Sequence, residues 1–264
     1  MDKHCFVIPA FKESPYLEEC VQHLLKQTIK SRIIITTSTP NSFIENIAKK
    51  YKLDYFINLN QMRGMASDWN FALSKVHSEL ATIAHQDDIY EASYAEKVIA
   101  KFDSLKQDNV LMAFTQYKEL VNGVERKTSL NAVVKNILMF PFLFNEKIKS
   151  NFLKKALLAF GDPIGCPTVT LNMKLLTDFS FSENYNCILD WVAWYHLAGR
   201  EGSFVYIKKP LMQHRIHFDS ETTHQINIGK RKEEEEAFFT LIWGKYISKF
   251  FISIYTLGHK QNKI

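Results

Sequence analysis

The sequence predicts an α/β fold built on a doubly wound, mainly parallel sheet flanked by helices. Two observations support this class. Short apolar runs alternate with segments of helical spacing through the first half of the 264 residues, and one apolar run, from Glu79 to His85, stops at the adjacent carboxylates Asp87 and Asp88. Alternating strands and helices imply parallel strands with right-handed crossovers, and the carboxyl ends of such strands form the ligand-binding edge.

Each element has its own local signal. Apolar runs predict strands, the spacing of leucines and other apolar residues predicts helices, and Asn41 is a typical N-cap. The expected order is strand His4–Ile8 closed by Pro9, helix Tyr16–Gln27, strand Arg32–Thr37, a helix after Asn41, strand Tyr55–Ile57, helix Met65–Val76 and the strand beginning at Glu79.

The pattern changes after Gln116. Asn131–Phe160 is apolar and basic, and Pro141 breaks or kinks any single helix there. Two helices packed on the sheet are favoured over a membrane-facing segment. Lys230–Ile264 has helical spacing with a wide apolar stripe and cationic flanks. It fits an interfacial helix, while packing on the domain or self-association is the alternative, and its removal is expected to leave a soluble domain.

Composition limits the partners and the compartment. The net charge of +5 and pI near 8.8 suit phosphate ligands or an anionic membrane surface, and we expect no nucleic acid. The four cysteines show no paired spacing, the N-terminus lacks the shape of a signal peptide, and no apolar stretch spans a bilayer. A cytoplasmic protein with reduced thiols is expected, placed at the inner face of the membrane if a lipid-linked partner is used.

The acid pair has two readings. Hard carboxylate oxygens at a strand end suit Mn²⁺ or Mg²⁺ carrying phosphates, with Asp88 exposed at the ligand edge. Alternatively, Asp87 and Asp88 form a turn and cap a helix that begins near Glu91.

Five segments, in order, resemble motifs of the family 2 glycosyltransferases with the GT-A fold. They are Val7-Ile8-Pro9-Ala10-Phe11-Lys12-Glu13, the Gly- and Asn-containing stretch Asn60–Ala72, the D-x-D-like Ala84-His85-Gln86-Asp87-Asp88, Cys187-Ile188-Leu189-Asp190-Trp191 and Gln213-His214-Arg215-Ile216-His217. The resemblance implies a GT-A-like domain over residues 1–229, with a nucleotide-binding half (1–117) and an acceptor-side half (118–229). Residues 230–264 then form a helical C-terminal extension.

The resemblance also implies roles for single residues. Asp88 and His217 would bind Mn²⁺ or Mg²⁺. Asp190, at the start of an amphipathic helix (Trp191–Leu197), would be the catalytic base, with Asp162 or Glu183 as alternatives. The donor-binding set would be Pro9, Phe11, Glu13, Thr37, Ser38, Arg63, Gly64, Asn70, Asp87 and Arg215. His85 is expected to be structural, and the remaining histidines, His214 among them, show no metal-ligand spacing.

One departure concerns the donor. The second strand ends Thr36-Thr37-Ser38, where family members commonly carry Asp residues that contact the nucleotide base. Hydroxyls can still hydrogen-bond uridine, which is kept as the default.

The function implied is an inverting, metal-dependent glycosyltransferase. It would move a sugar from a nucleotide diphosphate to a hydroxyl of a glycan or lipid-linked acceptor, in bacterial surface polysaccharide synthesis. Two alternatives stay open: a metal-dependent nucleotidyltransferase, disfavoured because Ala10–Ser14 lacks glycine, and a non-catalytic membrane- or partner-binding protein with a degenerate site.

Overall fold

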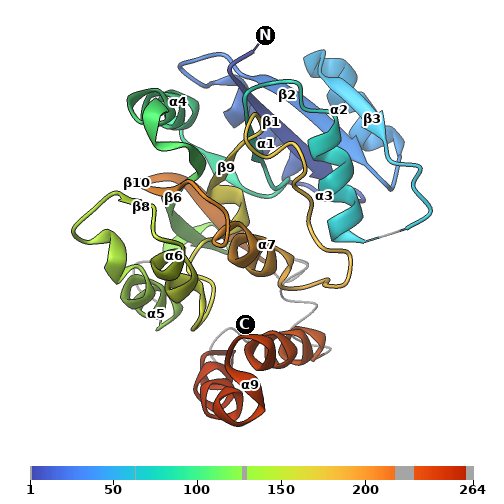
Figure 1. The fold of residues 1–264 in the computed structure, drawn as a ribbon. Coiled ribbons are helices and arrows are strands. Elements are labelled where there is room, and N and C mark those ends of the chain that lie inside the picture. Colours follow the sequence, from blue (N-terminus) through green and yellow to red (C-terminus); the bar gives the residue numbers. More distant parts are fainter. Residues whose placement is uncertain (1, 63, 127–129, 218–228, 260–264) are drawn as a thin grey trace.

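The computed structural model describes residues 2–62, 64–126, 130–217 and 229–259. It contains one large mixed sheet, covered by helices on both faces (Figure 1). The strands are β1 (His4–Ala10), β2 (Arg32–Thr37), β3 (Asp54–Ile57), β4 (Leu80–Ile83), β5 (Ile89–Tyr90), β6 (Val110–Val121), β7 (Val124–Arg126), β8 (Lys147–Ile148), β9 (Val169–Asn172) and β10 (Ser203–Ile216). The doubly wound α/β class is confirmed.

The sheet order is β3-β2-β1-β4-β9-β6-β10-β5, with β7 paired to β6 and β8 to β10. β1, β2, β3 and β4 run parallel, as do the two longest strands, β6 and β10. The short strand β9 is antiparallel to both β4 and β6, and so joins the two parallel blocks. The sheet is therefore mainly parallel, and its two halves are continuous.

Helices divide between the two faces, each over its own apolar core. One core is formed with α1 (Leu17–Leu25), α2 (Ser42–Tyr51) and α4 (Tyr94–Ser104). The other is formed with α3 (Met65–Ser74), α6 (Asn151–Leu158), α7 (Leu189–Leu197) and the first part of α9 (Lys230–His259). This two-sided covering explains why β1, β2 and β4 are buried along almost their whole length.

Several local predictions are confirmed. Asn41 caps α2 by accepting the Ile44 N–H at 3.0 Å. The segment around Pro141 holds two separate helices, α5 (Leu130–Leu138) and α6, with a single turn of 3-10 helix, Phe140–Phe142, between them. No helix in the described part of the chain is long and apolar enough to cross a membrane, and all four cysteines are free thiols.

The helix that carries Asp190 differs from the expectation. We predict an amphipathic helix, but α7 is apolar around most of its circumference, with Trp191, Val192, Ala193 and Trp194 all buried. The reason is that α9 covers the side of α7 that would otherwise face water: the rings of Phe238 and Phe239 lie 5.0 and 5.1 Å from that of Trp191.

The C-terminal helix resolves into two parts. Up to Trp243, whose indole N–H donates to the Ala159 carbonyl at 2.6 Å, α9 packs on the domain. Gly244, at φ 74°, then interrupts the helix, and beyond it Tyr246 is 90% exposed. Of the two alternatives for this segment, packing on the domain is therefore observed for its first part, and beyond Gly244 Ile252 also packs against the core.

Candidate functional site

The loop after β4 carries the acid pair. Asp88 is fully buried, contrary to the exposed position expected from the sequence. Its Oδ1 is hydrogen-bonded to Nδ1 of His214 and to the backbone N–H of Arg215, each at 2.9 Å. Both partners lie on β10, so the carboxylate is fixed by a strand far away in sequence. The predicted turn is present, since the Asp88 N–H donates to the His85 carbonyl at 3.2 Å, but the predicted capping is wrong, because β5 follows the pair directly and α4 starts only at Tyr94.

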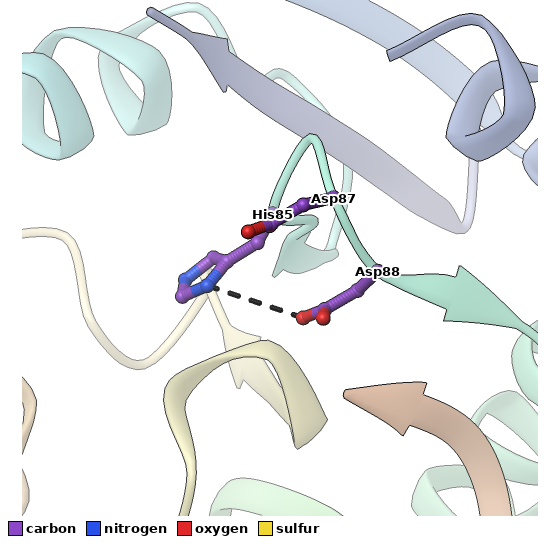
Figure 2. Close-up of side chains that lie close together, drawn as sticks. All are labelled: His85, Asp87 and Asp88. Atoms are coloured by element: carbon purple, nitrogen blue, oxygen red, sulfur yellow. Dashed lines mark ion pairs between the residues drawn. The ribbon is translucent and has the colours of Figure 1, made fainter. Parts of the chain in front are cut away.

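The second oxygen of Asp88 lacks a hydrogen-bond partner in the described part of the chain. Within the described residues, Oδ2 of Asp88 and Nε2 of His85 are buried and make no hydrogen bond. Leaving such polar atoms unsatisfied is costly unless something else binds them. His85, Asp87 and Asp88 each present one ligand atom within 4.8 Å of the others (Figure 2). Two carboxylates and an imidazole form a donor set that suits Mn²⁺, so the residues fit a divalent metal ion.

His85 was expected to be structural, and its ring does pack against Trp69, tilted by 38° with 5.3 Å between centroids. Its other side, however, faces the acid pair: Nδ1 lies 4.0 Å from Oδ2 of Asp88. The structure thus places His85 among the groups that could hold a metal ion.

Asp87 contacts the end of β10. Its Oδ2 lies 3.1 Å from Nε2 of His217, and its carbonyl accepts from Nε of Arg215 at 3.0 Å. Burial alone would raise the pKa of Asp87, but the His217 hydrogen bond and the charges of His85, His214 and His217 outweigh it and lower the pKa. Asp87 is therefore held in its ionised form.

Arg215 and His217 lie on the same side of the chain, as their spacing predicts. Both contact Tyr16, the Arg215 guanidinium 4.3 Å above the ring and His217 at 5.0 Å between centroids. Arg215 also pairs with Glu19 at 2.7 Å. Its role as a phosphate ligand, and that of His217 as a metal ligand, stay predictions: His217 contacts Asp87, and Arg215 contacts Glu19 and the Asp87 backbone.

The predicted donor-binding residues gather at the carboxyl ends of β1 and β2 and the start of α3. Pro9 lies in β1, and exposed Glu13 follows it. Phe11 is 44% exposed, and its N–H and carbonyl bond the side-chain amide of Gln86, both at 3.1 Å. Gly64 is the N-cap of α3. Arg63 lies outside the described residues.

Asn70 has a scaffolding contact. Its amide donates to the Phe181 carbonyl at 2.9 Å and accepts from the Phe181 N–H at 2.7 Å. Both ends of the side chain therefore tie α3 to the segment before α7. A contact between Asn70 and the donor remains a prediction.

The end of β2 has an acid that the sequence analysis missed. Thr37 is buried and accepts the Thr39 N–H at 3.0 Å. The Ser38 hydroxyl donates at 2.7 Å to Asp68, which also accepts from Asn58 at 2.8 Å. Asp68 comes from α3, so a carboxylate is present where β2 itself offers only hydroxyls.

Asp190 lies in the first turn of α7 and accepts the Trp191 N–H at 2.9 Å. Burial raises the pKa of Asp190, which the charge of Arg231, the Trp191 hydrogen bond and the charges of His85 and Lys135 offset in part. Asp162, whose Oδ1 accepts the Ile164 N–H at 2.9 Å in the expected turn, is a close electrostatic neighbour. Burial and the charge of Asp190 raise the pKa of Asp162 well above its ordinary range.

These two carboxyl groups therefore influence each other's protonation. Two half-buried acids in each other's field do not both ionise easily, so together they hold a proton more tightly than an isolated aspartate does. The role of Asp190 as the base stays a prediction. Asp190 is also linked electrostatically to His85 of the acid-pair loop.

Comparisons with known proteins identify the family. The model described as "Glycosyl transferase family 2" matches residues 5–177. The chain belongs to this family.

Among curated relatives, this family 2 glycosyltransferase is 28% identical over 118 residues to "Glycosyltransferase GlyG" of Streptococcus pneumoniae serotype 4, an alignment that covers 43% of this chain and 39% of GlyG. The match thus spans well under half of that relative's length. Among solved structures, it resembles S. aureus TarS residues 1–349 in complex with UDP-GlcNAc, at a TM-score of 0.63 and 15% identity over 97% of this chain and 72% of that chain.

A second fold neighbour of this glycosyltransferase is also a solved complex with a nucleotide sugar. It is the mannosyltransferase PcManGT from Pyrobaculum calidifontis in complex with GDP-Man and Mn²⁺, at a TM-score of 0.62 and 13% identity, covering 99% of this chain and 71% of that one. At these identities the likeness shows a shared GT-A fold.

Four site residues of this glycosyltransferase were not found from sequence. They are His214, His85, Asp68 and Lys135, whose Nζ donates to the Tyr117 hydroxyl at 2.6 Å. Three of them had a signal, because His85, His214 and Asp68 lie inside the quoted motif segments. Lys135 reaches the site through the placement of α5, which single-sequence spacing does not encode.

Proposed function

We propose that this chain transfers a sugar from a nucleoside diphosphate donor to an acceptor hydroxyl, with inversion at the anomeric carbon and with Mn²⁺ or Mg²⁺. The observation that carries the proposal is the buried Oδ2 of Asp88, which makes no hydrogen bond within the described residues and lies beside the imidazole of His85 and the carboxylate of Asp87. Their burial and fixed geometry favour a cation over water.

Asp88, Asp87 and His85 would hold the metal ion, with His217 adjacent to Asp87. When bound, the ion supplies Lewis-acid stabilisation of the charge that grows on the diphosphate leaving group. His214 and the Arg215 N–H keep Asp88 in position.

Asp190 accepts the proton of the attacking hydroxyl. Its carboxylate lies in the first turn of α7, whose buried residues fix the direction of the helix, and its raised pKa suits a group that takes up a proton. Direct displacement with inversion needs one base on the face of the sugar opposite the diphosphate, and Asp190 is assigned that role.

Uridine is the proposed nucleoside of the donor. The solved TarS complex with UDP-GlcNAc supports this choice, whereas the PcManGT complex with GDP-Man makes guanosine the comparison to test. The acceptor is proposed to be a glycan or a lipid-linked hydroxyl in bacterial surface polysaccharide synthesis, on the cytoplasmic side of the membrane, with the part of α9 beyond Gly244 offering exposed apolar residues to a lipid surface or a second copy.

Calorimetry with UDP and GDP, with and without Mn²⁺, tests the proposal. The parent should bind one nucleotide much more tightly with the metal, and Asp88→Asn should weaken that metal-dependent binding by about 100-fold or more. Asn keeps an oxygen to accept from His214, so the fold should survive. The matched control is Asp54→Asn, because Asp54 is an exposed acid on β3 that pairs with Arg32 of β2. Equal metal-dependent binding by the parent and by Asp88→Asn would show that Asp88 is not a metal ligand.

A further inference from the structure

A carboxylate from α9 caps the segment that leads into the Asp190 helix. Oε1 of Glu234 accepts the Asn186 N–H and Oε2 accepts the Cys187 N–H, each at 2.8 Å, while the Ile188 N–H lies 3.4 Å from Oε2. Ile188 is the N-cap of α7 and offers no side-chain cap of its own. The free N–H groups before α7 are thus satisfied by a side chain from 46 to 48 residues further along the chain.

The helix that supplies this carboxylate is itself anchored beside Asp190. Phe238, one turn after Glu234, is fully buried and packs on Trp191, the residue that follows Asp190. The Trp191 N–H in turn donates to Asp190. Consequently α9 holds both the residues before Asp190 and the residue after it.

The capped segment also borders the donor side of the site. A Cβ atom added to Gly64 would lie 3.9 Å from Oδ1 of Asn186, and Gly64 is the N-cap of α3. A shift of residues 186–188 would therefore move the start of α7 relative to the residues expected to hold the donor.

We propose that Glu234 is a positioning residue for catalysis: by fixing the backbone of Asn186, Cys187 and Ile188, it sets the direction in which Asp190 meets the acceptor hydroxyl. The inference rests on the proposed function, in which Asp190 is the base. Glu234 itself touches neither the donor nor the reacting atoms.

Two variants separate the reach of the carboxylate from its charge. Glu234→Gln keeps the shape and loses the charge, and Glu234→Asp keeps the charge and loses the reach. The neighbouring Glu233→Gln is the control, because Glu233 is exposed. All four proteins are compared at a temperature at which each remains folded.

The first readout does not depend on activity. Amide hydrogen exchange of the peptide that contains residues 186–188 should be about tenfold faster in both Glu234 variants and unchanged in Glu233→Gln. Unchanged exchange in the Glu234 variants would show that Glu234 does not fix the backbone of residues 186–188.

The second readout is the consumption of UDP-GlcNAc and GDP-mannose with Mn²⁺ and water as the acceptor. Both Glu234 variants should lose about tenfold in kcat while the donor KM stays within twofold of the parent, because the donor site is intact. Faster exchange with parental kcat, or parental kcat in Glu234→Asp alone, would overturn the positioning role. A parent that consumes neither donor while the exchange result holds would overturn the proposed function and leave Glu234 as a purely structural cap.

Discussion

The carboxylate of Asp68 accepts a hydrogen bond from the Ser38 hydroxyl at 2.7 Å, which places a fixed negative charge at the carboxyl end of β2. Asn58 donates to its other oxygen at 2.8 Å, so the position of the carboxylate is set from two strand ends. A base ring entering this corner would meet a hydroxyl whose proton already points to Asp68. The oxygen of Ser38 is then oriented as an acceptor for a ring N–H.

This relationship predicts that Asp68→Asn weakens nucleotide binding. An amide at this position can donate to Ser38, which reverses the hydroxyl and removes the oriented acceptor. We expect a loss of about tenfold in affinity for UDP, consistent with the net value of one hydrogen bond. Calorimetry with UDP measures it, and Asp54→Asn serves again as the exposed control. Affinity equal to that of the parent would remove Asp68 and Ser38 from the donor site.

The two buried acids near α7 should respond differently to the same substitution. Asp190→Asn removes the group that accepts the proton, so transfer should fall by about 100-fold or more with donor binding unchanged. Asp162→Asn keeps an oxygen that can accept the Ile164 N–H and, in the proposed assignment, removes no group that takes up the proton, so its rate should stay within a few-fold of the parent. Paired measurements of donor affinity and rate on both variants decide this. The reverse pattern would make Asp162 the base.

The dependence of the transfer rate on pH gives a further test of Asp190 as the base. Because burial raises the pKa of Asp190, the acidic limb of the profile should lie above the range of an ordinary aspartate. Arg231 lowers the pKa of Asp190, and its removal in Arg231→Gln should therefore shift the limb to still higher pH, whereas Lys232→Gln, at an exposed neighbouring position, should not. A limb that does not move in Arg231→Gln would show that another group controls it.

Two truncations should behave differently. Removal of residues 230–264 takes away Phe238 and Phe239 and uncovers Trp191. The sequence alone predicts a soluble truncated domain, whereas the packing of α9 predicts that the truncated domain unfolds. Each lost aromatic contact costs about 3 kcal/mol or more, a large part of a typical folding free energy.

Removal of residues 245–264 should instead keep the melting temperature within a few degrees and reduce binding to anionic vesicles, because the exposed Tyr246 and Ile247 are lost. Thermal melts and vesicle sedimentation measure both forms. Full vesicle binding by the shorter protein would argue against a lipid role for this part of α9.

The sequence was informative wherever one local signal decided the outcome. Strand Arg32–Thr37 and the Asn41 cap were found as the structure has them, because apolar runs and N-cap chemistry are local. The metal-site candidate was likewise visible at Asp87 and Asp88. The burial of Asp88 was missed, since it depends on His214 and the Arg215 N–H arriving on β10. The burial of most of α7 was missed because α9 covers the side that would otherwise face water.

The pairing of Asp88 with a strand 126 residues further along has a consequence for biosynthesis. While the chain is being made, the acid-pair loop emerges long before β10, and nothing can hold Asp88 in place during that interval. Closing such a distant contact is slow compared with forming the local βαβ units. The nucleotide site is therefore assembled late, and an emerging chain gains no stabilisation from donor or metal ion until the β10 strand has joined the sheet.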